Sequence, residues 1–211
     1  MKKFELTNEF IANRFGTKLF RIRALVEFGD VEAGELGGYV EKESNLGHDD
    51  NAWVYDNAWV YGNARVYGDA QVSGDARVYD NAWVYGDAQV SGDALVYGNA
   101  RVYGNAWVYG NAWVYGNAWV YGNALVCSDE DYAYAHGFGS VNRTTTFFRL
   151  KDGGVGVRCG CFYGTLAQFR DKIRETHGET KKAQEYLMLA DLMELRFEED
   201  ENEVGNRKYV E

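Results

Sequence analysis

A six-residue pattern repeated in tandem constrains the fold of this 211-residue chain more than any other feature. Thirteen consecutive copies fill residues 51–128, beginning with NAWVYD and ending with NALVCS. Every copy has alanine at its second position and valine at its fourth, so on a strand both side chains face the same side. Small alanine and β-branched valine suit a narrow, close-packed interior. Because repetition at a fixed period is the signature of repeat architectures, the pattern predicts a parallel β-solenoid.

The junctions between repeats predict the corners of the solenoid. Glycine followed by asparagine or aspartate recurs there, and these residues best tolerate positive φ. If each repeat forms one side of a prism, three repeats close a coil of eighteen residues, and residues eighteen apart stack into columns. Successive coils should then rise by roughly 4.8 Å. The chain contains no proline, which would interrupt such ladders.

The repeat also resembles that of a known group of proteins. An aliphatic residue followed four positions later by a small one, as in Val54 and Ala58, is similar to the hexapeptide repeat of left-handed parallel β-helix proteins. The resemblance implies a left-handed coil, whereas general crossover rules favour the right hand. Residues 28–47 resemble the opening of YdcK-like hexapeptide-repeat proteins of enterobacteria and phages, and residues 147–169 look like the C-terminal part of phage members. This family implies a phage or prophage origin and no settled activity.

The segments that flank the repeats are predicted to cover the ends of the solenoid, where strand edges would otherwise be unpaired. Residues 1–50 are expected to form an N-terminal β cap that merges into the first coil, because residues 18–26 alternate as a strand does. Residues 129–211 are expected to form a small α+β domain in the order ββαα. The whole chain is therefore predicted to be mainly β, with three parts.

The C-terminal part should begin with a loop at residues 129–143. Two strands are predicted to follow, at about 144–151 and 154–162, because the sequence KDGG between them is a hairpin signal. Cys159 and Cys161 alternate with the second strand's other side chains and are expected on its buried face.

Two helices are predicted to end the chain. TLAQ from Thr165 matches a capping box, which should open a helix that runs to about His177 and ends at Gly178. A second helix at about 180–197 is apolar almost all round in its middle. Such a helix should be covered both by its own domain and by another subunit, so a homo-oligomer is expected.

The variable third position of each repeat should face outward and form three columns that hold all six tryptophans. The columns are Trp53, Gln71, Gln89, Trp107 and Leu125; Trp59, Arg77, Leu95 and Trp113; and Arg65, Trp83, Arg101 and Trp119. Alternating Arg and Trp at coil spacing permits cation–π stacking of roughly 0.5 to 1 kcal/mol per exposed pair. Two tyrosine ladders are also expected, at 61, 79, 97 and 115 and at 67, 85, 103 and 121.

These aromatic columns have two interpretations. They can stabilise stacked strands without binding anything, or they can form an interface, because exposed Trp, Tyr and Arg are enriched at binding hot spots. The residues of the candidate binding surface are Trp107, Trp113, Trp119, Trp83, Arg65, Arg101, Tyr103 and Tyr121.

Two kinds of polar ladder are expected at the corners. Asparagines at 63, 81, 99 and 117 should exchange amide hydrogen bonds, as stacked amides do. Asp69 stacks on Asp87, and Asp75 on Asp93, and like charges one coil apart repel by roughly 1 kcal/mol in water. A bound cation is the alternative to solvated carboxylates, but no metal site is predicted.

Charge and composition narrow the possible partners and compartment. The formal net charge of −10 argues against binding a nucleic-acid backbone, which needs clustered Lys and Arg. No run of eighteen apolar residues occurs, and three cysteines make no disulfide framework. The sequence therefore predicts a protein of the bacterial cytoplasm that neither enters a membrane nor binds phosphate backbones.

Catalytic residues are not evident. The resemblance suggests acyl transfer, because many hexapeptide-repeat β-helices are acyltransferases that use a histidine base, yet the repeats contain no histidine. His48 and His136 should lie at opposite ends of the solenoid, and His136 is the one candidate base. No catalytic residue, metal or cofactor is predicted.

The leading hypothesis is therefore a non-enzymatic binding or scaffold protein that engages a host protein of unknown identity. Counter-defence is one purpose, and acidic mimicry of nucleic acid is another, motivated by the acidic run at residues 198–201. The alternatives are an acyltransferase with an inter-subunit site and a structural or virion assembly protein.

Overall fold

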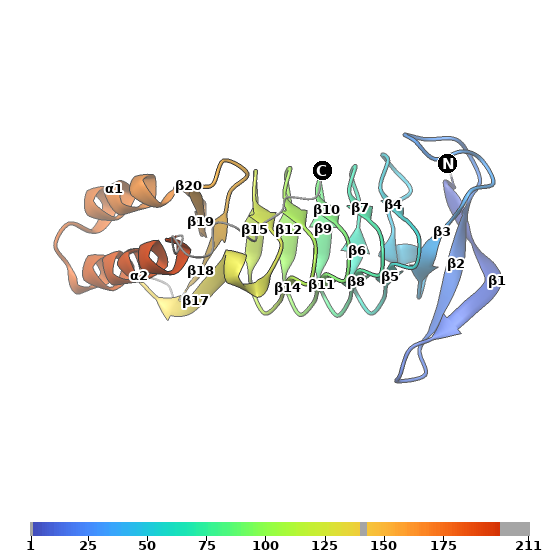
Figure 1. Ribbon diagram of the computed structural model, residues 1–211, viewed down its shortest axis with the longest axis horizontal. Helices are drawn as coiled ribbons and strands as arrows, with labels where there is room; N and C mark the ends of the chain where they lie inside the picture. Colours follow the sequence, from blue (N-terminus) through green and yellow to red (C-terminus); the bar gives the residue numbers. More distant parts are fainter. Residues whose placement is uncertain (1, 140–142, 199–211) are drawn as a thin grey trace.

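The computed structural model describes residues 2–139 and 143–198. The molecule is elongated, with the repeats in the middle, a β-hairpin at one end and a sheet with two helices at the other (Figure 1). The repeat strands run across the long axis of the molecule, as a solenoid requires (Figure 1).

The N-terminal strands are β1 (Phe4–Ala12), β2 (Lys18–Ala24) and β3 (Leu36–Val40), followed by a short 3-10 turn at Glu43–Asn45. They form an antiparallel meander, and β3 then pairs in parallel with the repeat strand β5, opposite Trp59 and Val60. The hairpin is thus continuous with one solenoid sheet and covers the edge at which the coils begin.

Each of the thirteen repeats contributes one short strand. These strands are β4 (Trp53–Val54), β5 (Trp59–Val60), β6 (Arg65–Val66), β7 (Gln71–Val72), β8 (Arg77–Val78), β9 (Trp83–Tyr85), β10 (Gln89–Val90), β11 (Leu95–Val96), β12 (Arg101–Tyr103), β13 (Trp107–Val108), β14 (Trp113–Val114), β15 (Trp119–Tyr121) and β16 (Leu125–Val126). They pair in parallel at a spacing of eighteen residues, in three sheets with the orders β5-β8-β11-β14, β16-β13-β10-β7-β4 and β15-β12-β9-β6. The predicted mainly β fold with a parallel solenoid of three-sided coils is confirmed.

The interior and the corners follow from the invariant positions. The alanines and valines of all thirteen repeats are 0% exposed, which confirms that they face inward. Corner glycines have positive φ, and at Gly86 an added Cβ would lie 3.1 Å from the nitrogen of Gly104 in the next coil. Asp80 takes the same conformation at φ 59°, and its carboxylate accepts a hydrogen bond from the amide of Gly98. Aspartate thus replaces the corner glycine by hydrogen bonding to the next coil.

Trp53 corrects the expectation that all six tryptophans face solvent. Its side chain is 0% exposed and lies edge-on to Phe4 and Phe28, with ring centroids 6.2 and 5.3 Å away. The N-terminal segment lies over this side of the first coil, and Gly37 approaches so closely that a Cβ would lie 2.7 Å from the Trp53 ring. The cap therefore turns an outward position of the repeat into a core position.

The C-terminal part contains four strands rather than the two predicted. After a 3-10 turn at Asp129–Asp131 come β17 (Tyr132–Phe138), β18 (Arg143–Arg149), β19 (Val155–Cys159) and β20 (Phe162–Thr165), which form an antiparallel sheet in that order. The expected loop at 129–143 is wrong, because Tyr132–Phe138 pairs along β18. The expected strand at 154–162 is interrupted by a turn at Gly160, after which β20 begins. Cys161 lies in this turn and is exposed, whereas Cys159 at the end of β19 is partly buried.

The two predicted helices are confirmed as α1 (Leu166–His177) and α2 (Lys181–Phe197). The capping box at Thr165 forms, and Gly178 caps the end of α1 with a φ of 57°. Both helices pack on the sheet around a second core. Its members are Phe147, Val157, Leu166, Phe169, Ile173, Ala183, Tyr186, Ala190, Met193 and Phe197. On the opposite side of α2, Met188, Leu192 and Leu195 are 71%, 54% and 67% exposed.

The sheet closes the last coil through strand β18 and the residues that follow it. The amide of Trp119 donates to Thr146 Oγ1 at 3.0 Å, and Leu150 bridges to Ala124 of the final repeat. A buried ion pair joins Arg149 Nε to Asp131 Oδ1 at 3.2 Å beneath this junction. The solenoid core therefore continues into the C-terminal sheet.

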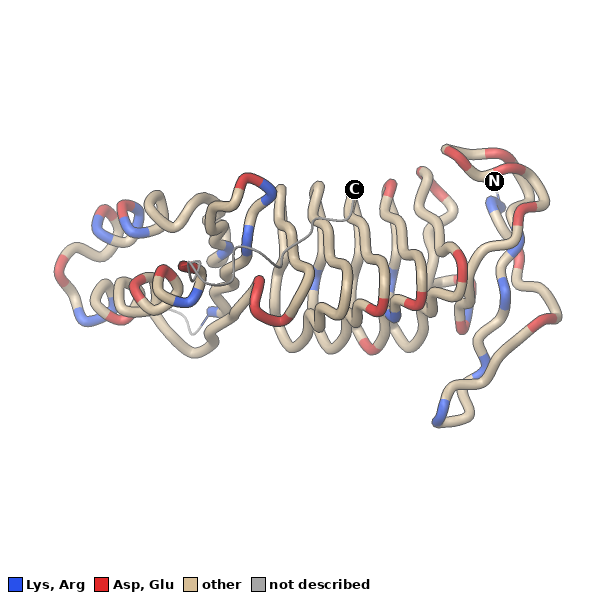
Figure 2. Tube along the Cα trace, viewed as in Figure 1, with Lys and Arg blue, Asp and Glu red and all other residues tan. Residues whose placement is uncertain are grey.

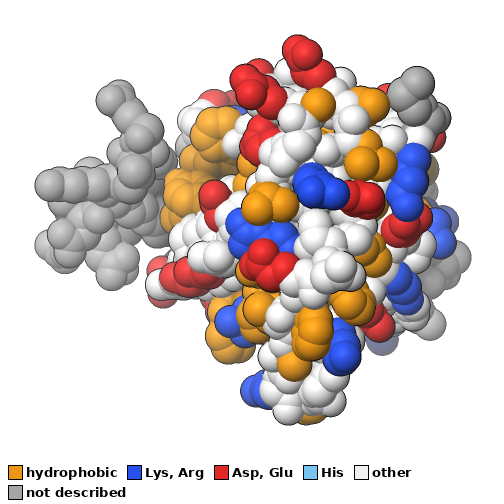
Figure 3. All heavy atoms as spheres, turned by 90° about the vertical axis from the view of Figure 1, so that its right-hand side faces the viewer, with side chains coloured by type: hydrophobic (Ala, Val, Ile, Leu, Met, Phe, Trp, Pro, Cys, Tyr) orange, Lys and Arg blue, Asp and Glu red, His pale blue; other side chains and the backbone are white. Residues whose placement is uncertain are grey.

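Charges are unevenly placed along the molecule. Only three of the 22 Lys and Arg residues lie in the repeats, and acidic residues mark several corners of the coils (Figure 2). The N-terminal end instead mixes basic, acidic and apolar side chains (Figure 3), including Phe10 and Phe15, which are 47% and 76% exposed. Within residues 2–139 and 143–198, neither helix is long and apolar enough to cross a membrane.

Candidate binding surface

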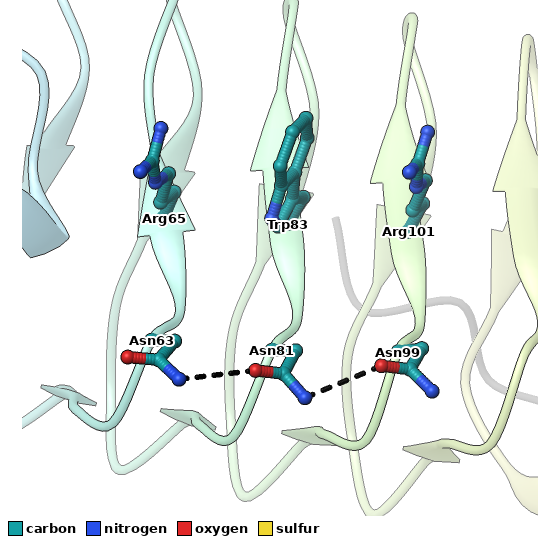
Figure 4. A pocket seen from close by; sticks show the side chains of 6 residues that line it. All are labelled: Asn63, Arg65, Asn81, Trp83, Asn99 and Arg101. Carbon is teal, nitrogen blue, oxygen red and sulfur yellow. Dashed lines mark hydrogen bonds between the residues drawn. The ribbon is translucent and has the colours of Figure 1, made fainter.

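One face of the solenoid carries a continuous column of alternating arginine and tryptophan. Strands β6, β9, β12 and β15 pair in register, so Arg65, Trp83, Arg101 and Trp119 lie directly above one another. The guanidinium of Arg101 is 4.8 Å from the Trp83 ring and 4.9 Å from the Trp119 ring, and Arg65 is 5.9 Å from Trp83. The predicted cation–π stacking is confirmed, and Figure 4 shows Trp83 between the two arginines.

The column extends into the C-terminal sheet. Arg158 of β19 places its guanidinium 5.3 Å from the Trp119 ring, and its Nη1 donates to the carbonyl of Phe162 at 3.2 Å. Its Nε is buried without a partner among the described residues. Arg158 could not be assigned to this surface from the sequence, because strand alternation gives the face on which its side chain lies but not which solenoid column that face meets.

An asparagine ladder runs beside the column. Each amide nitrogen donates to the amide oxygen one coil further on, at 3.2 Å from Asn63 to Asn81, 3.3 Å to Asn99 and 3.2 Å to Asn117. Lys42 Nζ lies 3.5 Å from the amide oxygen of Asn63 at the N-terminal end of this row. The predicted amide ladder is confirmed, and it presents a second hydrogen atom on every amide nitrogen.

A tyrosine ladder follows the other side of the column. The rings of Tyr67, Tyr85, Tyr103 and Tyr121 stack with centroids 4.9, 4.7 and 4.3 Å apart. Burial raises the pKa of Tyr103, and the charge of Arg158 opposes that shift. Since each ring stacks on its neighbour, the ring faces inside the ladder are covered and cannot stack on a ligand.

Two grooves border the column. One, of about 380 Å³, is lined by Asn63, Arg65, Asn81, Trp83, Asn99 and Arg101, and these side chains form two parallel rows (Figure 4). The other, of about 320 Å³, lies on the tyrosine side and is lined by Arg65, Tyr67 and Trp83 together with residues that lead into the first coil. Arg65 and Trp83 thus form a ridge between two hollows.

The cations of this face have no acidic partner in residues 2–139 and 143–198. Lys42, Arg65, Arg101 and Arg158 make no ion pair with any described residue, whereas Arg149 and Arg170 both pair with carboxylates. The protein carries a formal net charge of −10, so these cations form a basic strip on an acidic molecule. We call the residues Lys42, Arg65, Trp83, Arg101, Trp119 and Arg158, with the asparagine ladder, the Arg–Trp strip.

Six of the eight residues named from sequence lie on this face, on β6, β9, β12 and β15. Trp107 and Trp113 lie on the other two sheets, at β13 and β14. Lys151 Nζ lies 3.9 Å over the Trp107 ring, and Trp113 is 47% exposed. The last full coil therefore presents its tryptophans in three directions and forms no single surface.

The histidines do not belong to the strip, and His48 and His136 lie at opposite ends of the solenoid. His48 stacks on Phe4 in the N-terminal cap, and His136 Nδ1 lies 2.9 Å from Thr144 Oγ1 at the opposite end. His177 stacks on Tyr186 in the helical part. Among the described residues no three His, Cys, Asp or Glu side chains gather in a way that could hold a metal ion.

The fold and this surface define a β-solenoid repeat protein with both ends of the solenoid covered. The repeats also match the family model described as YdcK Beta solenoid repeat, in segments at 58–70, 70–86, 88–104, 96–110, 100–116 and 106–122. These matches fall within the coils and agree with their geometry. No curated protein matches the chain.

Proposed function

We propose that this chain is a non-enzymatic binding protein that presents the Arg–Trp strip to a protein partner. The observation that carries the proposal is a row of cations with no carboxylate partner among the described residues, on a protein of net charge −10. Arg and Trp are among the residue types most enriched at binding hot spots. The grooves of about 380 and 320 Å³ give a partner's side chains concave surfaces beside these residues.

If the Arg–Trp strip only stabilised the stacked coils, the N–H donors of its arginines would have no role. The cation–π stack uses the faces of the guanidinium groups, whereas their N–H donors lie in the guanidinium plane. Arg65 and Arg101 have no carboxylate partner in the described part of the chain, and apart from a hydrogen bond from Arg101 to the Tyr85 hydroxyl these donors can bind an acceptor. A partner with acidic groups would satisfy them.

The resemblance in the leader and in the C-terminal part supports a finer proposal, that the protein is phage or prophage encoded and engages a host protein. Nucleic-acid mimicry would rest on the corner carboxylates, such as Asp69, and on the acidic run at 198–201. Of that run, residues 199–201 lie outside the described residues. A homo-oligomer is part of the same proposal, and the exposed stripe of α2 supports it.

Affinity capture with charge-reversed variants tests the function. The protein with both Arg65→Glu and Arg101→Glu should lose the partners that the unaltered protein captures from bacterial lysate. Arg77→Glu is the matched control, because Arg77 occupies the same repeat position on another face and stacks 4.4 Å from Trp59. If both variants capture the same partners, the strip is not the binding surface.

The tryptophans of the other two faces need a separate comparison. Trp107→Ala combined with Trp113→Ala should leave capture intact, since neither residue lies on the strip. Loss of capture by this variant alone would move the binding surface to the last coil.

A further inference from the structure

Resting on the proposed function, we infer that the Arg–Trp strip binds an acidic peptide in the polyproline II conformation, with a carboxylate at every third residue. Such a peptide would lie along the solenoid axis and cross the coils. The spacing of the guanidinium groups, the available hydrogen-bond donors and the aromatic faces that are already covered together favour this kind of partner.

The spacing of the guanidinium groups matches this conformation. Arg65 and Arg101 lie two coils apart in register with Trp83, which corresponds to roughly 9.6 Å at the usual strand separation. A polyproline II helix has three residues per turn and rises about 3.1 Å per residue, so residues three apart lie on one side at roughly 9.3 Å. In a β-strand, side chains on one face recur at roughly 6.7 Å, which does not match.

The same alternation continues beyond Arg101. Trp119 follows one coil later and Arg158 stacks on it, so a third guanidinium lies next in the column. Carboxylates at three successive turns of the peptide would meet Arg65, Arg101 and Arg158. Guanidinium binds carboxylate with two parallel N–H donors, which gives the contact a defined geometry as well as a charge.

The asparagine ladder fits the peptide backbone. A polyproline II segment makes no internal hydrogen bonds, so its carbonyl groups remain free to accept. The ladder uses one hydrogen atom of each amide nitrogen between coils, as at Asn81 and Asn99, and leaves the other for such an acceptor. Both components line the groove of about 380 Å³ (Figure 4).

The aromatic groups favour a peptide over single-stranded nucleic acid. Proteins that bind single strands stack the bases on open aromatic faces. Here Trp83 lies between Arg65 and Arg101, and Trp119 lies between Arg101 and Arg158. The tyrosine rings beside them stack on one another. The strip therefore offers a row of hydrogen-bond donors, but few open aromatic faces on which nucleobases could stack.

Fluorescence anisotropy with labelled peptides tests the inference. Four tandem copies of Glu-Pro-Pro should bind, and a peptide of equal composition with its glutamates in one block should bind more weakly. The Gln-Pro-Pro analogue should not bind. Arg101→Gln should weaken binding of the Glu-Pro-Pro peptide about tenfold, as loss of a charged hydrogen-bond pair does. Arg77→Gln, on another sheet, should leave it unchanged.

Four results would overturn the inference. Equal binding of the spaced and the blocked peptide would show that the three-residue spacing of the carboxylates does not matter. Tighter binding of an oligothymidylate than of any peptide would show that the ligand is a single-stranded nucleic acid. If no peptide binds while Arg65→Glu with Arg101→Glu still abolishes partner capture, the acidic peptide is wrong and the proposed function stands. Insensitivity of capture to that variant would contradict both.

Discussion

The guanidinium of Arg158 lies 5.3 Å from the ring of Trp119, so a strand of the C-terminal sheet completes a column that begins in the solenoid. The two residues are 39 positions apart in sequence and belong to different sheets. This contact aligns the sheet with one of the three faces. The C-terminal part is therefore fixed in rotation about the solenoid axis as well as along it.

Removing the Arg158 side chain should loosen this alignment. Arg158→Ala deletes the contact with Trp119 and the hydrogen bond to Phe162, and we expect the free energy of unfolding to fall by about 1 to 2 kcal/mol. Urea denaturation measures the change. Arg174→Ala is the control, because Arg174 is exposed on α1, and it should alter stability by less than about 0.5 kcal/mol. Equal losses in the two variants would show that the column does not hold the sheet.

Trp53 should contribute far more to stability than a tryptophan at the same repeat position elsewhere. Trp53→Ala leaves a cavity beneath the N-terminal cap, because the side chain is 0% exposed, and should cost about 3 to 5 kcal/mol. Trp113→Ala, at a 47% exposed site, should cost about 1 kcal/mol or less. Denaturant unfolding of both variants checks the difference. Similar values would mean that the cap does not cover the first coil.

The carboxylate of Asp131 should be needed at the junction of the solenoid and the sheet. It is 1% exposed, pairs with Arg149 and accepts from the amides of Cys127 and Ser128. Asp131→Ala removes the carboxylate that pairs with the buried guanidinium of Arg149 and should destabilise the protein by about 3 to 5 kcal/mol. Glu130→Ala, next to it but exposed, should have little effect when both are compared by thermal unfolding. Retention of stability in Asp131→Ala would argue against a buried ion pair.

The tyrosine ladders should make stability fall in alkali. Burial raises the pKa of Tyr79 to about 12, and its stacked neighbours Tyr61 and Tyr97 add to the shift. An unfolded tyrosine titrates near 10, so the folded state holds this proton more tightly. That stabilisation is complete below about pH 10 and is lost as the pH rises through about 12. Unfolding free energies measured across this window should decline, and less steeply in Tyr79→Phe.

The titration of Lys3 sets the lower limit of the pH range in which the tyrosine effect can be measured. Burial lowers the pKa of Lys3 to about 8 from 10.5, so between these values the unfolded state binds more protons and stability should rise with pH. The tyrosine effect is therefore measured above about pH 10.5. A flat profile there, with phenolate absorbance showing normal titration in the folded protein, would contradict shifted tyrosines.

The exposed stripe of α2 should mediate self-association. Met188, Leu192 and Leu195 recur at helical spacing and are more than half exposed, so a second copy of the chain would bury them. Sedimentation should give a mass above one chain for the unaltered protein and of one chain for Leu192→Glu. Glu185→Gln, on the same helix, should keep the oligomer. A single-chain mass for the unaltered protein would refute the expectation.

The columns of the solenoid could be predicted residue by residue because an exact period fixes each side chain's neighbours. Arg101 must lie between Trp83 and Trp119 once the coil has eighteen residues, and the amide ladder follows for the same reason. The capping box at Thr165 was predictable because it depends on residues within one turn.

The errors arose where neighbours come from outside the period. Trp53 and Trp107 occupy equivalent repeat positions, yet only Trp53 lies under the N-terminal segment. Tyr132–Phe138 lacks β-branched residues, and pairing with β18 makes it a strand. Arg158 joined the strip only through the docking of one sheet against another. Contacts between the solenoid and the segments that flank it leave no periodic pattern in the sequence of either part.

The three-sided coil also restricts how the number of repeats in this molecule can change. Deleting or inserting three repeats would return the chain to the same face, whereas a change of one repeat would shift everything downstream to the next face. Arg158 would then meet a different column, and the basic strip would end at the last coil. Lengthening by whole coils would instead extend the strip in proportion. Changes in repeat number should therefore be accepted in multiples of three.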